Sequence, residues 1–303
     1  MAAGAWTDLL DPSREELERY LPPDIHDLAL ERLLAPALHE DEPRPRLESQ
    51  GDYGYGVFLF PVLHQGDDAV YYQEVDIVVT RERLLTVRKT PEGGKPPYDT
   101  TEVKAACRPD ETPASFLYRL VDDLAEHFLD LIDDVDEEID QLEDQVETLP
   151  AAYIRGRISH LRHDLLHIRR TLGPTRDAVR RVLDNRVELE GREFFTRDIE
   201  LNFADAYDKL LRASEGLELS RDLLGGVRDY HQSKIANEQN EVMKKLTVGA
   251  ALILVPTFIV GLYGQNFRNI PELRWGFGYA WSWSVIVVVT LLQIWYFRRK
   301  GWL

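Results

Sequence analysis

Two uncharged segments near the C-terminus constrain the fold of this 303-residue chain more than any other feature. The first, residues 246–263, contains 18 residues, and the second, residues 275–297, contains 23. A helix rises about 1.5 Å per residue, so both can cross a hydrocarbon core of about 30 Å, the first only just. The 11 residues 264–274 join them. The two segments therefore predict a membrane hairpin whose two ends lie on the same side.

Basic residues flank this hairpin on one side. Lys244 and Lys245 precede the first segment, and Arg298, Arg299 and Lys300 follow the second. Basic residues favour the cytoplasmic side of a membrane. We therefore expect a multi-pass protein of the cell (inner) membrane, with both termini in the cytoplasm and the joining loop outside. The acidic N-terminus lacks an apolar run, so a signal peptide is not expected.

The net charge of −17 is concentrated before the hairpin. Residues 1–243 carry 29 basic and 52 acidic side chains, a net charge of −23. Such a region repels phosphate and attracts divalent cations, so nucleic acid is not an expected partner. The single Cys107 excludes an intramolecular disulfide and fits a reducing compartment. No nucleotide-binding fingerprint is present in the sequence, so an ATP-driven pump is not expected.

The sequence predicts three regions: a cytoplasmic α/β domain at 1–110, a helical hairpin with a stalk at 111–243, and a two-helix transmembrane domain at 244–303. In the first region, Ser13 followed by Glu16 indicates a helix start. Runs rich in Val, Tyr, Phe and Ile predict three strands. These runs are residues 54–63, 70–79 and 83–89.

The second region shows the periodicity of long helices. A heptad seam is formed by Phe128, Ile132, Val135, Ile139, Leu142, Val146 and Leu149. Pro150 is predicted to end this helix, and an antiparallel helix follows with Ile154, Ile158, Leu161, Leu165 and Ile168. Gly173-Pro174 is predicted to interrupt that second helix. A last helix is expected from about Phe195 into the first membrane segment, with Gly225-Gly226 as its weak point.

One side of this last helix is small and polar. Counting back from Gly264 in alternating steps of three and four residues defines a set that we call the polar line. It consists of Gly264, Gly261, Thr257, Leu254, Ala250, Thr247, Met243, Asn240, Ala236, Ser233 and Asp229. Nine of the eleven are small or polar, and helical periodicity keeps them on one side. Close helix packing also selects small residues, but it has little use for a carboxylate. A conduit is the other interpretation, and it requires a ring of several copies.

The joining loop begins with Tyr-Gly-Gln-Asn at 263–266 and continues with Pro-Glu-Leu-Arg-Trp at 271–275. These residues and the basic C-terminal end resemble the CorA family of magnesium and cobalt transporters, whose loop carries Gly-Met-Asn. The resemblance implies a homopentameric funnel, with an α/β cytoplasmic domain, a long helical stalk and two C-terminal transmembrane helices. It implies Mg²⁺ as substrate and as regulatory ligand, and no organic cofactor.

The resemblance also assigns roles to residues. It implies a selectivity filter at Gly264, Gln265 and Asn266, with Gln265 standing where the family has Met. It implies apolar gates at Met243, Leu246 and Leu254, since rings of apolar side chains block ions by dewetting. Asp205 is implied as a regulatory metal ligand. The remaining predicted pore-lining residues are Asp229, Asn240, Thr247, Thr257 and Gly261. Pro256 is expected to bend the pore helix.

The leading hypothesis is a channel for potential-driven uptake of Mg²⁺, with Co²⁺ and Ni²⁺ as further candidate ions, gated by intracellular Mg²⁺. Its expected partners are copies of itself, membrane lipid and divalent cations, and it is not expected to be an enzyme. Three alternatives stay open: a zinc transporter of the same superfamily, a membrane-anchored coiled-coil scaffold, and a tethered metalloenzyme. The last would need His160, His163 and His167, which share a helical face.

Overall fold

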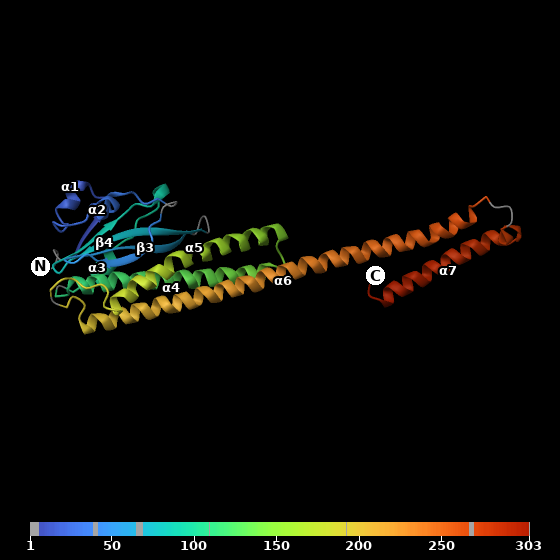
Figure 1. Cartoon of the computed structure of the whole chain (residues 1–303). Coiled ribbons are helices and arrows are strands. Elements are labelled where there is room, and N and C mark those ends of the chain that lie inside the picture. The colour runs from blue at the N-terminus through green and yellow to red at the C-terminus, as the bar shows by residue number, and fades with distance from the viewer. Residues whose placement is uncertain are drawn as a thin grey trace. The chain divides into compact units, whose positions relative to one another are not determined.

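The computed structural model describes residues 6–38, 42–64, 69–108, 110–191, 193–266 and 270–302 (Figure 1). The chain divides into two compact units, Met1–Arg228 and Asp229–Leu303. Helix α6 (Arg197–Tyr263) contributes residues to both. The predicted domain boundaries after residues 110 and 243 stay a prediction.

The first unit contains a five-stranded sheet in the order β1-β5-β4-β3-β2. Its strands are β1 (Trp6–Leu10), β2 (Arg46–Ser49), β3 (Gly54–His64), β4 (Ala69–Val79) and β5 (Leu84–Arg88). Only β1 and β5 pair in parallel, while the other neighbours are antiparallel. The three predicted strands match β3, β4 and β5. The two edge strands were not predicted because neither β1 nor β2 contains Val, Ile, Tyr or Phe, the residues that marked the other three.

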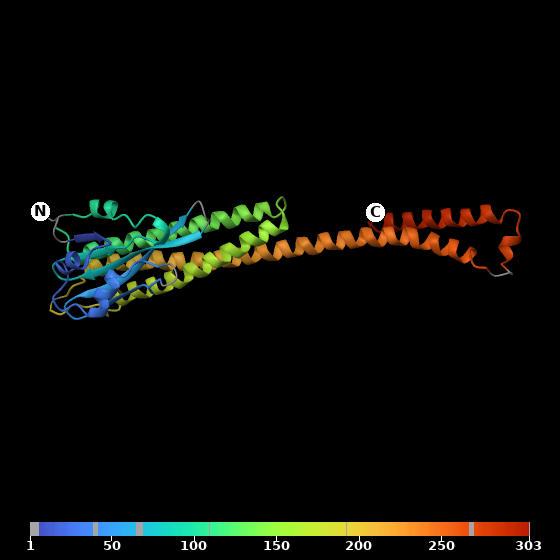
Figure 2. The same ribbon diagram turned by 90° about the horizontal axis from the view of Figure 1, so that it is seen from above.

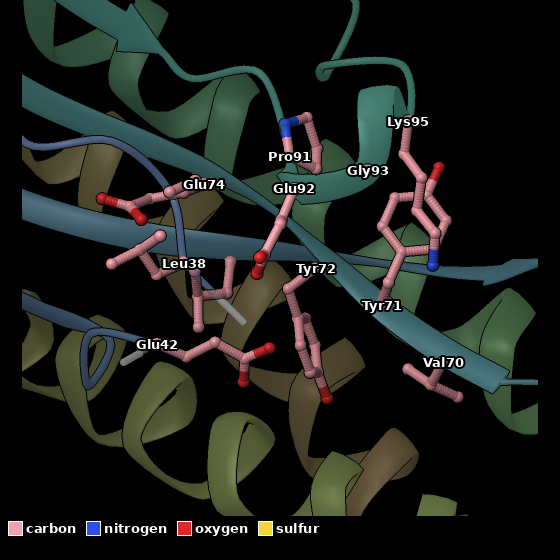
Figure 3. A pocket seen from close by; sticks show the side chains of 12 residues that line it. Leu38, Glu42, Val70, Tyr71, Tyr72, Glu74, Pro91, Glu92, Gly93 and Lys95 are labelled. Atoms are coloured by element: carbon pink, nitrogen blue, oxygen red, sulfur yellow. The ribbon is translucent and has the colours of Figure 1, made fainter. Parts of the chain in front are cut away.

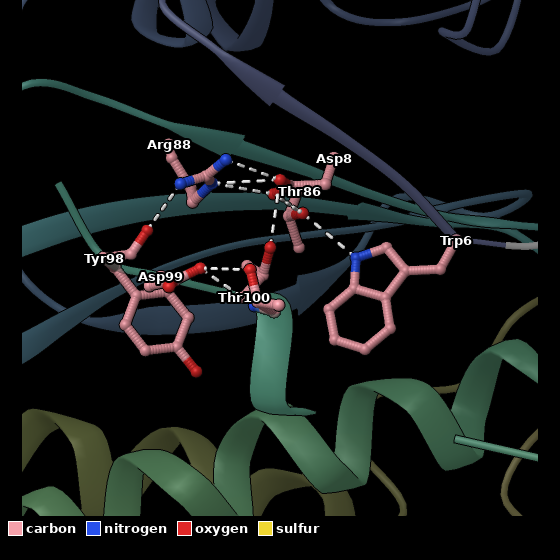
Figure 4. A network of polar contacts seen from close by, with 8 residues as sticks. Trp6, Asp8, Thr86, Arg88, Tyr98, Asp99 and Thr100 are labelled. Carbon is pink, nitrogen blue, oxygen red and sulfur yellow. Dashed lines mark hydrogen bonds and ion pairs between the residues drawn. The ribbon is translucent and has the colours of Figure 1, made fainter. Parts of the chain in front are cut away.

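Strand β1 is fixed to its neighbour by a polar network (Figure 4). The Asp8 carboxylate accepts hydrogen bonds from Thr86 Oγ1 at 2.7 Å, Arg88 Nε at 3.0 Å and Thr100 Oγ1 at 3.0 Å. Trp6 Nε1 donates to Thr86 Oγ1 at 3.0 Å. Buried polar groups need such partners. The network thus compensates for the shortness of β1.

Helices cover both faces of the sheet (Figure 1). On one face lie α1 (Arg14–Glu18) and α2 (Asp27–Leu34), whose core residues include Leu17, Leu30 and Leu33. Ser13 Oγ accepts from the Glu16 amide at 3.3 Å, which confirms the predicted N-cap. The other face carries α4 (Pro113–Gln145), α5 (Ala151–Leu183) and the first part of α6. Short elements complete the unit: η2 (Glu92–Gly94) and α3 (Thr101–Ala105).

Helices α4 and α5 run antiparallel, side by side in both views (Figures 1 and 2). The predicted seam of α4 is buried from Phe128 to Val146, and Ile154 to Ile168 of α5 join the same core. The end of α4 differs from the prediction, since the helix stops at Gln145 and Pro150 is the N-cap of α5. Leu149, the last predicted seam residue, therefore lies outside α4 and is exposed.

The predicted interruption at Gly173-Pro174 is wrong, because α5 continues through Pro174 to Leu183. Proline removes one helical hydrogen bond. Around it, Thr175 Oγ1 donates to the Thr171 carbonyl at 2.8 Å, and Thr171 Oγ1 lies 2.6 Å from the Tyr72 hydroxyl. Both threonines are buried. A tertiary contact with Tyr72 of β4 and a bond within the helix thus hold a turn that local sequence disfavours. Gly225 and Gly226 likewise do not interrupt α6.

A charged cluster is buried between β4, β5 and α2. Lys89 Nζ lies 2.5 Å from Glu74 Oε1 and 2.7 Å from Asp76 Oδ2, and it donates to the Arg32 carbonyl at 2.8 Å. Burial, together with the neighbouring Asp76 carboxylate, raises the pKa of Glu74 to about 7. One buried ammonium thus holds two largely buried carboxylates.

Lys89→Met is expected to lower the free energy of unfolding by about 3–5 kcal/mol, because it leaves buried carboxylates without their cation. Thermal unfolding of the purified full-length protein in detergent measures the change. Arg14→Met is the matched control, since Arg14 forms an exposed pair with Glu18 at 3.8 Å. Exposed pairs contribute about 0–1 kcal/mol. Equal melting temperatures for the two variants would show that the buried cluster does not stabilise the domain.

Candidate ion conduit and its mouth

The second unit is a helical hairpin. It consists of the end of α6, the turn η3 (Pro271–Arg274) and α7 (Gly278–Arg299). Helices α6 and α7 each contain an apolar stretch long enough to cross a membrane, and only 6% of each stretch is buried. The second predicted span began at residue 275, but α7 starts three residues later. The reason is a separate turn, closed by the Trp275 amide donating to the Glu272 carbonyl at 3.2 Å.

Aromatic side chains gather at both ends of α7. Before its first turn, Trp275 stacks on Phe277 with ring centroids 5.2 Å apart, and Trp281 meets Trp275 edge-on at 6.2 Å. At the other end, Phe297 stacks on Trp302 at 5.9 Å. Aromatic belts at both interfaces are typical of membrane helices. The same aromatic residues are present in the sequence, and their placement supports α7 as a span.

One face of α6 packs against α7, and the two helices lie side by side in both views (Figures 1 and 2). The contact includes a hydrogen bond of 3.2 Å from Gln293 Nε2 to the Ala251 carbonyl. The residues of α6 that are buried or half-buried in this part recur every three or four positions. They are Val248, Ala251, Leu252, Val255, Pro256, Ile259 and Tyr263. Helical periodicity places them on one side, which is the side facing α7.

The polar line lies on a different side of α6. All eleven of its residues, from Asp229 to Gly264, are exposed in the chain. At about 100° per residue, the line is on roughly the opposite side of the helix from the face packed on α7. Packing against α7 therefore does not account for its small residues. The surface is left for contact with other copies, for water, or for both.

The threonines of the polar line present oxygen atoms outward. Thr247 Oγ1 donates to the Met243 carbonyl at 2.8 Å, and Thr257 Oγ1 donates to the Ile253 carbonyl at 2.7 Å. Each hydroxyl proton is thus used within the helix. The remaining lone pairs can accept hydrogen bonds from water, including water bound to a cation.

Three predicted gate residues are exposed in the single chain. Met243 and Leu254 belong to the polar line, and Leu246 lies beside it. Their side chains are between 60% and 68% exposed, which is high for apolar residues of this size. In a ring of copies such side chains would narrow the space that the line encloses. Their role as gates stays a prediction.

The predicted filter follows the last turn of α6. The Gly264 amide donates to the Val260 carbonyl at 2.9 Å, and the Gln265 amide donates to Leu262 at 3.4 Å. A Cβ at Gly264 would lie 3.2 Å from the Val260 oxygen, so a side chain there would crowd the turn. Gln265 and Asn266 are exposed. No hydrogen bond of either carboxamide occurs within the described part of the chain.

Asp205, the predicted regulatory ligand, belongs to α6 in the first unit and has a side chain 64% exposed. Lys209 Nζ lies 3.9 Å from it, and closer to Asp122 at 2.7 Å and Glu126 at 2.6 Å. Burial alone would lower the pKa of Lys209, but its bonds to these two carboxylates raise it. The fold thus brings two carboxylates of α4 near Asp205. Sequence reasoning missed them because they lie about 80 positions earlier in the chain.

The histidines proposed for a metalloenzyme do not converge. His167 Nε2 lies 2.6 Å from Glu42 Oε2, while His160 and His163 are exposed. Over the described ranges, no three His, Cys, Asp or Glu side chains are arranged to hold a metal ion.

A cavity of about 270 Å³ beside β4 contains Glu42, Glu74 and Glu92 (Figure 3). Glu42 already contacts His167, and Glu74 already contacts Lys89. Glu42 and Glu74 are therefore engaged within the domain.

A family model described as CorA-like Mg²⁺ transporter protein matches residues 2–299. The cobalt/magnesium transport protein CorA of Thermotoga maritima is 29% identical over 280 residues, which cover 92% of this chain and 77% of the relative. The putative metal ion transporter YfjQ of Bacillus subtilis is 28% identical over 306 residues, with coverage of 98% and 89%.

Solved structures give the same result for the fold. The complete CorA magnesium transporter of Methanocaldococcus jannaschii matches with a TM-score of 0.78 at 22% identity, over 98% of this chain and 91% of that one. The cytoplasmic domain of ZntB from Vibrio parahaemolyticus matches with a TM-score of 0.57 at 18% identity, over 77% and 88%. The predicted α/β domain, long helix and two C-terminal apolar helices are confirmed. Because the family model spans nearly the whole sequence, the chain belongs to the CorA-like Mg²⁺ transporter family.

Proposed function

We propose that this protein is a divalent-cation channel of the cell membrane that carries Mg²⁺ into the cytoplasm. In this proposal, copies of α6 form a ring, five by analogy with the family, and their polar lines enclose the conduit. The observation that carries it is the exposure of all eleven line residues, together with their position away from α7. A helix that only anchors a protein in the membrane does not need a line of small and polar residues. The family is one of transporters, which also argues against the scaffold and the enzyme.

The mouth of the conduit would be formed by Gly264, Gln265 and Asn266. Mg²⁺ sheds its water reluctantly and prefers oxygen ligands. A ring of neutral carboxamide oxygens would hold the hydrated ion through its water shell without trapping it. The exposed carboxamide of Asn266 suits this role as the principal filter group, with Gln265 adding a second polar group beside it. The tight turn at Gly264 would let the chain come close to the axis.

Ion entry would be driven by the membrane potential. A divalent cation gains about 4.6 kcal/mol per 100 mV of inside-negative potential, twice the value for one charge. Rings of Met243, Leu246 and Leu254 would close the conduit by dewetting. Closure at high internal Mg²⁺ requires a site that binds the ion better in the closed state. We assign Asp205 to that site, and Asp229 and Asn240 to the inner part of the conduit.

Asp205→Asn is expected to make the channel less sensitive to internal Mg²⁺. Allosteric coupling between sites typically changes affinity by about 5- to 150-fold, so the internal Mg²⁺ concentration for half-closure should rise at least about fivefold. Patch-clamp recording at stepped internal Mg²⁺ measures this. Asp198→Asn is the control, because Asp198 is an exposed carboxylate in the first turn of the same helix. Identical closure curves for the two variants would remove Asp205 from the regulatory site.

A zinc transporter is the second candidate, favoured by the fold shared with the cytoplasmic domain of ZntB. Flux into proteoliposomes that contain the purified protein distinguishes the two. We expect entry of Mg²⁺ under an inside-negative potential, with Co²⁺ and Ni²⁺ as weaker or equal substrates. Entry of Zn²⁺ that requires a proton gradient, without entry of Mg²⁺, would assign the protein to zinc transport. If none of these ions enters, a membrane-anchored coiled-coil scaffold becomes the best explanation.

A further inference from the structure

The apolar contact face of α7 contains one carboxamide. The residues of α7 that are buried or half-buried follow a seam with steps of three and four. They are Gly278, Ser282, Val285, Ile286, Val289, Thr290, Gln293, Ile294 and Phe297. Gln293 therefore lies on the face packed against α6. A polar side chain inside a membrane helix is costly and is kept when it has a function.

The two polar atoms of the Gln293 carboxamide differ in their hydrogen bonding. Nε2 donates to the Ala251 carbonyl of α6 at 3.2 Å. Oε1 is buried and has no hydrogen-bond partner among the described residues. The reverse orientation would put two oxygen acceptors against each other, so the hydrogen bond itself fixes which end faces α6.

The hydrogen bond reaches α6 beside its proline. Pro256 has no amide hydrogen, so the Leu252 carbonyl lacks its usual helical partner. Ala251 precedes that carbonyl by one residue. The contact from Gln293 therefore holds α6 next to the point where its own hydrogen-bond ladder is interrupted.

We propose that Gln293 is a positioning residue for transport. Its hydrogen bond to the Ala251 carbonyl fixes the register and rotation of α6 on α7, and so keeps the polar line turned away from α7. The inference rests on the proposed function of that line as the wall of the conduit. A carboxamide in a mainly apolar helical seam can specify register at a cost in stability. Interhelical hydrogen bonds in membranes are weak enough to adjust a packing without dominating it.

Because Oε1 of Gln293 has no hydrogen-bond partner among the described residues, replacing Gln293 distinguishes a positioning role from a stabilising one. A buried acceptor without a donor opposes folding, so an apolar side chain of similar length should not weaken the hairpin. Gln293→Met is therefore expected to keep the melting temperature of the wild-type assembly, or to raise it. Its maximal Mg²⁺ flux should fall roughly three- to tenfold, the change that corresponds to one interhelical hydrogen bond.

The test uses Thr257→Cys in a Cys107→Ser background, labelled in proteoliposomes by a water-soluble thiol reagent that does not cross lipid. Labelling of the cysteine at 257 should be roughly three- to tenfold slower with Gln293→Met than with Gln293. Thr290→Val is the matched control, because Thr290 Oγ1 donates at 2.8 Å to Ile286 within α7 itself. This control should leave labelling, flux and melting temperature unchanged.

Equal labelling and equal flux with Gln293 and Gln293→Met would overturn the inference and leave the proposed function intact. A large fall in melting temperature for Gln293→Met would also overturn it, because the residue would then be a structural one. If the cysteine at 257 is not labelled even with Gln293 in place, the conduit itself is absent, and both proposals fall.

Discussion

Asn266→Ala is expected to reduce potential-driven Mg²⁺ entry by roughly 10- to 150-fold, the range that corresponds to losing a hydrogen bond to a charged group. The variant removes the exposed carboxamide at the mouth while leaving the end of α6 at Tyr263 unchanged. Flux into proteoliposomes with a Mg²⁺-sensitive dye measures the loss. Melting temperature and oligomer size should stay at their wild-type values, because the side chain makes no hydrogen bond within the described residues.

Gln265→Met is the matched control for this experiment. It removes the neighbouring carboxamide and restores the residue that the CorA motif carries at this position. We expect it to retain Mg²⁺ entry within about threefold of wild type, a change of less than 1 kcal/mol. Full flux in Asn266→Ala, or an equal loss in both variants, would contradict the assignment of Asn266 as the principal filter residue.

Leu254→Asn is expected to leave the channel conducting at internal Mg²⁺ concentrations that close the wild type. Leu254 is 68% exposed and lies on the polar line, so in a ring its side chain would form a dewetted constriction. A carboxamide at this point would hold water and remove the barrier. We expect residual flux at high internal Mg²⁺ to rise at least about tenfold, which corresponds to about 1.4 kcal/mol of the closing free energy.

Ile253→Asn tests whether this effect depends on the position. Ile253 is adjacent in sequence and 71% exposed, but it lies off the polar line. The same substitution there should not produce flux at high internal Mg²⁺. If both variants conduct, general damage to the helix explains the result. If neither conducts, Leu254 does not form the gate.

Periodicity made most of the fold predictable. Runs rich in Val, Tyr, Phe and Ile gave β3, β4 and β5, and the seam from Phe128 to Val146 gave the buried face of α4. Such patterns repeat over several turns or residues, so local sequence is sufficient. The edge strand β1 is different, because it depends on Asp8 reaching Thr86 and Arg88 far along the chain.

Tertiary contacts explain the predictions that were wrong. Gly173-Pro174 was expected to interrupt a helix, but the buried Thr171 holds that turn against Tyr72 of β4, a contact that local sequence does not encode. The surroundings of Asp205 were also unpredictable. Asp122 and Glu126 of α4 approach Asp205 because α4 packs beside α6. Both carboxylates bind Lys209 of α6.

For the candidate conduit, the sequence predicted which residues share the polar line, but not what that line faces. A line of small residues fits both a packing interface and a wall facing water. The hairpin excluded one of these partners, because α7 occupies the other side of α6 and contacts the Ala251 carbonyl. The line is left for contact with other copies, for water, or for both. The roles of the filter, the gates and Asp205 stay predictions, since they depend on several copies of the chain.

The most direct test of the central claim is a comparison of cysteine accessibility along α6 in the assembled protein. Single cysteines replace Thr247, Thr257 and Gly261 on the polar line, and Ile253 and Phe258 off it, in a Cys107→Ser background. All five native residues are exposed in the single chain, so exposure there does not decide the result. If the line encloses a water-filled conduit, a water-soluble thiol reagent will label the first three positions, and added Mg²⁺ will slow that labelling. Labelling that is equal at all five positions, or confined to 253 and 258, would contradict the account.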